Sequence, residues 1–149
     1  MSLPITKYYS TVLHQYNGNA INWSSDTIKI GLVTSAYTPN LSTDIYWSTP
    51  AASEVTGTNY TAGGATITGI SVSQTTGVVT VTGNDPDWAA SSTGFTGVQY
   101  AVLYKSTGTS STSPLIGYYN IGGSGSNQGG DFIIQFNSAA GSGTIFTAS

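Results

Sequence analysis

The stretch Thr27–Val33 (TIKIGLV) decides the fold of this chain. Apolar residues alternate along it, which places Ile28, Ile30 and Leu32 on one face and Lys29 on the opposite face. A repeat of two residues is that of a β-strand with one buried face. The stretch therefore predicts a half-buried strand, and the rest of the sequence repeats this kind of signal.

Six further runs have the length and composition of strands, because they are rich in β-branched and aromatic residues and are bounded by turn-forming residues. They cover Ala65–Ser73, Gly77–Thr82, Val98–Tyr104, Leu115–Ile121, Asp131–Phe136 and Thr144–Thr147. A short turn that ends in Gly77 joins the first two runs as a predicted hairpin. The run at Val98–Tyr104 is apolar on both faces and is expected at the centre of the sheet packing.

Helix signals are few. One helical turn is expected within Leu41–Ser53, and Ile5–Tyr16 fits either a strand or a helix. Seven or eight short strands at this spacing predict an all-β fold, an antiparallel β-sandwich of jelly-roll-like type. We expect one domain of this kind over residues 20–149, preceded by an extended N-terminal arm over residues 1–19.

Charged residues are scarce, at 6% of 149 residues against roughly 25% in an ordinary soluble domain. The nine are Lys7, Lys29, Lys105, Asp26, Asp44, Glu54, Asp85, Asp87 and Asp131. Three scattered lysines cannot neutralise a phosphate backbone, so nucleic acid is not an expected partner. No apolar run approaches the length of a membrane span, and with no Cys there is no thiolate metal site. A surface of hydroxyls, glycines and tyrosines suits burial against other protein.

Catalytic chemistry has few candidates. His14 is the one histidine, has no acidic residue near it in sequence, and is predicted to be structural or exposed. Asp85 and Asp87 form the one close carboxylate pair, which fits a turn in the sequence Asn-Asp-Pro-Asp or, as the alternative, a Ca²⁺ site. A hydrolase that uses Asp85, Asp87 or Glu54 is unsupported by their spacing. We therefore predict no enzyme, no cofactor and no metal.

Aromatic residues leave two alternatives open. Trp23 precedes the first strong strand and is expected in the core, whereas Trp47 and Trp88 lie in loops and are the better candidates for an interface. The same aromatic residues also fit the stacking of sugars, as in a carbohydrate-binding module.

Five stretches together give a recognisable ordered pattern. They are Ala20–Pro39 (AINWSSDTIKIGLVTSAYTP), Glu54–Gly64 (EVTGTNYTAGG), Val98–Lys105 (VQYAVLYK), Ser113–Tyr118 (SPLIGY) and Gly130–Phe136 (GDFIIQF). This pattern resembles small virion structural proteins of tailed bacteriophages. Those proteins carry an opening W-x-x-D-T-I-K-V-x-L-x-T-S-x-Y-T-P and a later E-V-x-G-x-G-Y-x-x-G-G, in which Asn59 here replaces the usual Gly.

The resemblance implies a virion component without catalysis, in particular a head decoration or cement protein on the capsid exterior, assembled in the bacterial host cytoplasm. Its expected partners are the major capsid protein and further copies of itself in a homotrimer. Tyr8, Tyr9 and Tyr16 of the predicted arm, with Trp47 and Trp88, are the candidate interface residues. The alternative is a tail or fibre module that binds host carbohydrate for receptor recognition.

Overall fold

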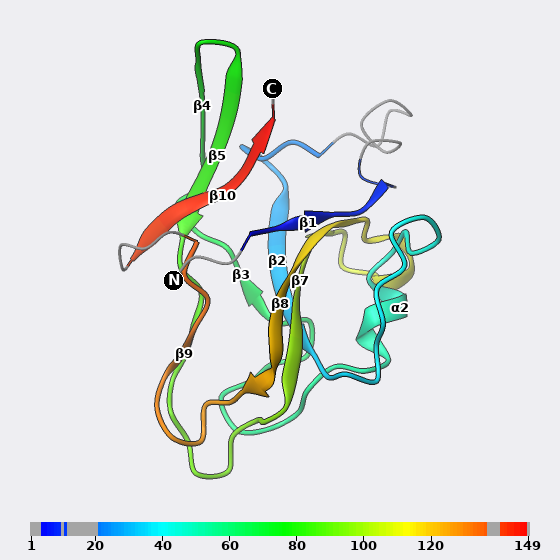
Figure 1. Cartoon of the computed structure of the whole chain (residues 1–149), viewed down its shortest axis with the longest axis vertical. Coiled ribbons are helices and arrows are strands. Elements are labelled where there is room, and N and C mark those ends of the chain that lie inside the picture. Colours follow the sequence, from blue (N-terminus) through cyan, green and yellow to red (C-terminus); the bar gives the residue numbers. More distant parts are fainter. Residues whose placement is uncertain (1–3, 10, 12–20, 137–140, 149) are drawn as a thin grey trace.

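The computed structural model describes residues 4–9, 11, 21–136 and 141–148. Its centre is a five-stranded antiparallel sheet in the order β1-β8-β7-β2-β3, shown in Figure 1. These strands are β1 (Thr6–Lys7), β2 (Thr27–Val33), β3 (Ala65–Thr66), β7 (Val98–Ser106) and β8 (Leu115–Gly125). The predicted antiparallel all-β class is confirmed at this level, with the short helix α2 (Ser48–Ala51) inside the stretch expected to hold a helical turn.

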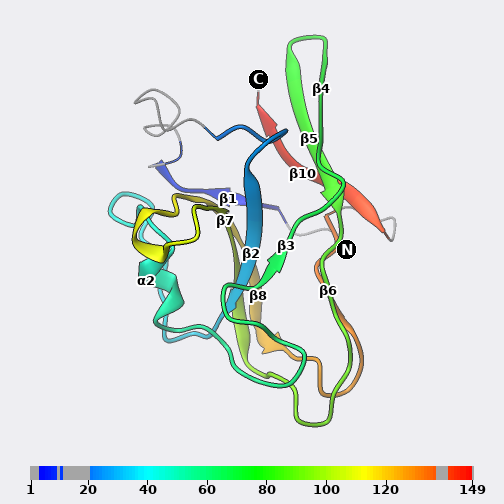
Figure 2. The same ribbon diagram turned by 180° about the vertical axis from the view of Figure 1, so that it is seen from behind.

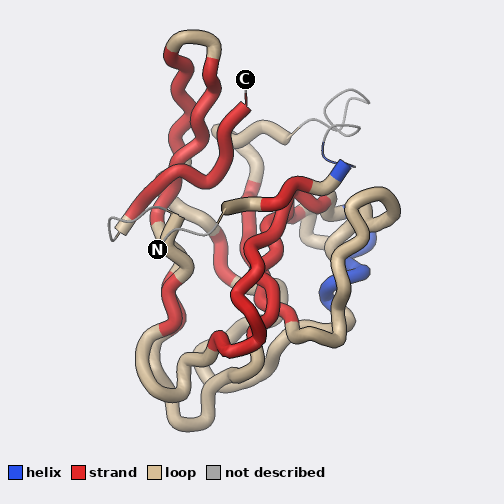
Figure 3. Tube along the Cα trace, in the orientation of Figure 1, coloured by secondary structure: helices blue, strands red, loops and turns tan. Residues whose placement is uncertain are grey.

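Two smaller antiparallel sheets complete the fold. One has three strands in the order β10-β5-β4, and the other pairs β6 with β9. Their strands are β4 (Ser71–Thr75), β5 (Val78–Asn84), β6 (Asp87–Trp88), β9 (Phe132–Ile133) and β10 (Ser142–Ala148). Figure 3 shows how much of the remaining chain is loop, mostly beside and below the central sheet.

The central strand β7 is buried on both sides, as its sequence predicts. It lies between β8 and β2. Ala101 and Leu103 enter a core cluster that also contains Val81, Trp88 and Ile145 from the smaller sheets. On the opposite face, Val102 and Tyr104 enter a second cluster with Tyr8, Tyr37 and Trp47. The two apolar faces of this run therefore pack against different parts of the chain.

Strand β2 matches its expected bounds and its expected faces. Ile28, Ile30 and Leu32 belong to the first core cluster, whereas Gly31 lies under the indole of Trp47 on the other face. A Cβ added at Gly31 would lie 2.2 Å from the indole Cη2 atom. The close approach of the loop that carries Trp47 to the sheet therefore requires a residue without a side chain at this position.

The run Ala65–Ser73 forms two strands, and the expectation of one continuous strand is wrong. Ala65–Thr66 pairs with β2, while the chain then turns at Gly69, where φ is +63°, and begins β4 at Ser71. Figure 2 shows β3 beside β2 and the hairpin leaving in another direction. A left-handed backbone favours glycine, so one residue divides a run whose composition is uniform.

The predicted hairpin itself is confirmed as β4 and β5. Its two turn residues, Thr76 and Gly77, both have positive φ, at +49° and +84°. Two left-handed central residues define the type I′ turn, whose twist matches that of the strands it joins. The hairpin projects beyond the rest of the molecule (Figure 1).

Strand lengths differ from the prediction near the end of the chain. β8 continues to Gly125, through Gly122 and Gly123 with positive φ, where its register to β7 shifts. β9 is only Phe132–Ile133, the two residues that pair with Asp87–Trp88. Composition marks these runs as extended chain, but pairing partners decide where a strand ends.

Prediction: Gly31→Ala lowers the free energy of unfolding by about 1–3 kcal/mol, the usual cost of an extra methyl group in a close-packed core. The added Cβ must displace the Trp47 ring, which stacks on Tyr104 at 4.5 Å. Denaturant unfolding measures the change. Gly129→Ala is the control, because nothing lies within 4 Å of its added Cβ. Equal effects of the two substitutions would contradict this account of the packing.

Candidate functional site

The carboxylates of this chain hold the backbone in place. Asp26 pairs with Lys105 at 2.9 Å and accepts the backbone N–H of Asn22. Asp131 accepts the N–H of Ala90. Within the described residues, no three His, Cys, Asp or Glu side chains come together in a group that could hold a metal ion.

The sequence around Asp85 fits either a turn or a Ca²⁺ site, and the contacts of Asp85 favour the turn. Its Oδ1 accepts the N–H of Phe136 at 2.9 Å, and its Oδ2 accepts the N–H of Gly141 at 3.0 Å. Both oxygens therefore face hydrogen-bond donors, a surrounding that favours the turn over a cation site. Asp87 begins β6 and is exposed.

Glu54 lies at the centre of a hydrogen-bonded clamp. Its Oε1 accepts the hydroxyl of Tyr60 at 2.5 Å and the N–H of Gly63 at 2.6 Å, while the Tyr60 oxygen accepts the N–H of Leu32 in β2. Burial raises the pKa of Glu54 above its usual range, although these hydrogen bonds and the Lys29 charge act against the rise. Tyr104 also donates its hydroxyl to the Gly63 carbonyl. The stretch Glu54–Gly64 is thus bound to the central sheet.

Two other positions in Glu54–Gly64 show why the loop needs particular residue types. Gly64 has φ of +74°, and an added Cβ would lie 1.9 Å from the Ile30 carbonyl oxygen. Asn59, which stands where the resemblance has Gly, has φ of +66° and donates its side-chain amide to the Ala89 carbonyl. Asn is among the few residues that tolerate this left-handed conformation. The stretch is a structural loop.

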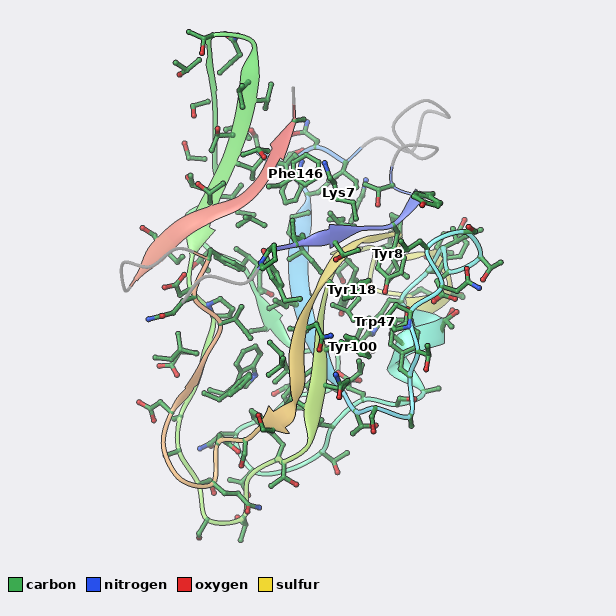
Figure 4. The ribbon with its side chains drawn as sticks, viewed as in Figure 1. Lys7, Tyr8, Trp47, Tyr100, Tyr118 and Phe146 are labelled. Atoms are coloured by element: carbon green, nitrogen blue, oxygen red, sulfur yellow. The ribbon has the colours of Figure 1, made fainter. Side chains whose placement is uncertain are left out.

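The described part of the predicted arm, residues 4–9 and 11, packs on the body. β1 pairs with β8, and Tyr8 is fully buried. The Tyr37 hydroxyl donates to Asp44 at 2.7 Å, so Tyr8 donates to Tyr37 across their 2.7 Å contact. Burial raises the pKa of both tyrosines well above the usual range. Figure 4 shows Tyr8 and Tyr118 together on the sheet, with ring centroids 5.7 Å apart.

The predicted interface residues lie in different environments. Tyr9 is 64% exposed and is available to a partner, whereas Tyr8, Trp47 and Trp88 are buried, the two tryptophans with only 4% exposed. A partner that binds without rearranging the fold would not touch these three side chains. Tyr16, like His14, lies outside the described residues. The interface prediction for Tyr9 and Tyr16 stays a prediction.

A pocket of about 440 Å³ opens between the central sheet and the 106–113 loop. Lys29, Glu54 and Tyr104 line it on one side, and Ser106, Thr109 and Ser110 on the other. No hydrogen bond or ion pair shorter than 4 Å joins the Lys29 ammonium to a described residue. The sequence placed Lys29 on the outer face of its strand but gave no sign of the loop that faces it.

The three-stranded sheet is the most unusual surface of the molecule. None of its residues is charged, and no charged residue lies between Glu54 and Asp85 in the sequence. Every residue of β4 is exposed, with Val72 at 43% and Val78 at the tip at 36%. The sequence signal for this surface is the long uncharged segment between Glu54 and Asp85, which contains the predicted hairpin.

Comparisons with known proteins leave the chain without an assigned family: no family model, curated protein or solved structure matches it. No helix within the described ranges is long and apolar enough to cross a membrane.

Prediction: Glu54→Gln removes a pH dependence of stability. Because burial raises the folded-state pKa of Glu54 above 4.5, the folded protein holds this proton more tightly than the unfolded chain does. The stability of the natural protein therefore falls as pH rises from 4.5 through the folded pKa. Gln still accepts the Tyr60 and Gly63 hydrogen bonds but cannot ionise.

Urea unfolding of both proteins across this pH range measures the effect. The stability of the natural protein relative to Glu54→Gln should decrease toward neutral pH. A constant difference between the two would show that the carboxyl ionises as readily in the folded chain as in the unfolded one.

Proposed function

We propose that this chain is a non-enzymatic structural protein of a tailed-bacteriophage virion, a decoration or cement protein that binds the outer head between capsomers and stabilises the shell. The observation that carries the proposal is the uncharged, projecting β4–β5 hairpin, in a molecule whose carboxylates mainly hold its own loops. The ordered motifs that resemble phage virion proteins support it. Such a surface fits stable contact with protein and offers little to a charged substrate.

The partners in this proposal are the major capsid protein and two further copies in a homotrimer, which matches local threefold positions of an icosahedral shell. Many modest contacts that act together would strengthen the shell through avidity. The location is the capsid exterior, after assembly in the bacterial host cytoplasm. We also propose that the β-sheets form a sandwich of jelly-roll-like type. The N-terminal arm, which carries the exposed Tyr9, would contact the shell or a neighbouring subunit.

Prediction: particles with the protein show extra density on the outer head at local threefold positions, and particles without it lack that density and lose their DNA at lower temperature. Cryo-electron microscopy and a thermal DNA-release assay measure the two effects. Because only 6% of the residues are charged, contact with the shell should depend little on charge, and binding should change little when salt is raised, since screening acts on charged contacts.

The control is the same particle with purified protein added back, which should restore both density and thermal resistance. Density on the tail with none on the head would end the decoration proposal. Release of the protein by moderate salt would contradict an uncharged contact.

The pocket favours a second candidate, a tail or fibre module that binds host carbohydrate. Its volume lies in the range of small-ligand sites. The Lys29 ammonium has no hydrogen-bond acceptor within the described residues, the Glu54 carboxylate is close by, and hydroxyls of the 106–113 loop line the opposite side. Paired donors and acceptors of this kind suit a neutral polyhydroxylated ligand.

Prediction: if this second candidate is right, a glycan array detects selective binding that Lys29→Met abolishes. Lys7→Met is the matched control, because it removes the same charge from a residue that does not line the pocket. An array with no selective signal removes this candidate and leaves the decoration proposal in place.

A further inference from the structure

We infer that the β4–β5 hairpin is the contact through which copies of this chain associate with one another. The inference rests on the proposed function in one respect, because it assigns the subunit contact of the proposed homotrimer to one element. It also separates this contact from the contact with the shell, which then falls to other parts of the surface.

No strand among the described residues pairs with the outer edge of β4. β4 is the last strand of its sheet, it pairs with β5 along its whole length without a register shift, and all five of its residues are exposed. Natural edge strands are usually guarded by charge, by Pro, by a bulge or by a covering segment. Ser71–Thr75 has no charged residue or Pro, and its pairing shows no bulge. An edge of this kind is suited to contact with another chain.

An apolar stripe also runs out of the core along the hairpin. Val81 is 1% exposed and belongs to the first core cluster, and Val72 lies directly opposite it in β4. Val79 is two residues nearer the turn in β5, so it shares this face, as does Gln74, which lies opposite Val79 in β4. The other face of β4 carries Ser71, Ser73 and Thr75. The hairpin is therefore amphipathic, and its apolar face continues past the part that the body covers.

The hairpin cannot rely on its own two strands for stability. An isolated two-stranded hairpin is only marginally stable in water, and a further strand or a packed face is needed. β10 is that further strand and pairs with β5 from Asn84 to Val79, so only the outer end of the hairpin lacks it. The outer end, from Thr75 to Val78, projects beyond the body (Figure 1) and gains most from a partner.

Charge and timing select a second copy as that partner. The chain has a net charge of −3, and all its charged residues lie outside the three-stranded sheet, so two copies meet there with the least repulsion. In the proposed function, a copy binds the shell only after the shell has assembled. Until then, every free copy would expose an unguarded edge. Another copy is present from synthesis onward and can cover that edge at once.

The experiment uses the full chain and compares Val72→Lys with two controls by light scattering over a range of concentrations. Val72→Thr keeps the β-branched shape without charge. Ser92→Lys adds the same charge to an exposed residue between β6 and β7. The loop that joins these two strands extends to the end of the molecule opposite the hairpin tip (Figure 1). We expect the natural protein and both controls to be oligomers of one mass, and Val72→Lys to be a folded monomer by circular dichroism.

A second measurement does not depend on disrupting the contact. The chain has no Cys, so Thr75→Cys introduces a unique thiol for a spin label, and Ser92→Cys gives a matched label at the far end. Electron spin resonance should detect short distances between labels of different copies at position 75 and only long ones at position 92.

The outcomes separate the inference from the proposed function. A monomeric natural protein, an oligomeric Val72→Lys variant or distant labels at position 75 would overturn the inference. A Val72→Lys variant that stays oligomeric but no longer binds particles would make the hairpin the shell contact, and the decoration proposal would stand. A monomeric Val72→Lys variant supports the inference even if the natural protein binds no particle.

Discussion

The carboxylate of Glu54 is the constraint on which the arrangement of the sheets depends. It fixes the Tyr60 hydroxyl, which in turn accepts the N–H of Leu32 in the central sheet. The Tyr60 ring packs on Phe95 and Trp88, with centroids 5.6 Å and 6.3 Å away, and Trp88 belongs to the two-stranded sheet. One half-buried carboxylate therefore links two sheets that share no hydrogen-bonded strands among the described residues.

The other carboxylates of this charge-poor chain are used in the same way. Asp26, Asp44, Glu54, Asp85 and Asp131 each accept backbone or tyrosine hydrogen bonds from their own chain. Because these carboxylates are bonded to their own loops, few charged side chains remain to form ion pairs with a partner. Specific contact must then come from shape, hydroxyl groups and exposed apolar area, and the hairpin provides all three.

The sequence predicts local structure well and tertiary position poorly. The alternation at Thr27–Val33 and the apolar run at Val98–Tyr104 report which faces are buried, and both are confirmed. Trp47 and Trp88 were assigned to an interface because they lie outside strong strand signals, yet the loop with Trp47 folds back over β2 and Trp88 enters a two-residue strand. The alternation of apolar residues along a strand cannot predict such contacts, since the contacting residues are distant in sequence. The open edge of β4 likewise follows from topology.

Among the described residues, the β10 edge of the three-stranded sheet has a guard and the β4 edge has none. On β10, the Lys7 ammonium lies 4.7 Å from the Phe146 ring centroid and donates to the Thr147 carbonyl, as Figure 4 illustrates for Lys7 and Phe146. Lysine is a common guard of edge strands. Association through two different open edges would continue without limit and give a fibre. With a single open hairpin in each copy, association can instead close around a symmetry axis. Contact between the same edge of two copies gives a dimer, whereas contact between the β4 edge of one copy and another face of the hairpin in the next gives a closed ring such as the proposed trimer.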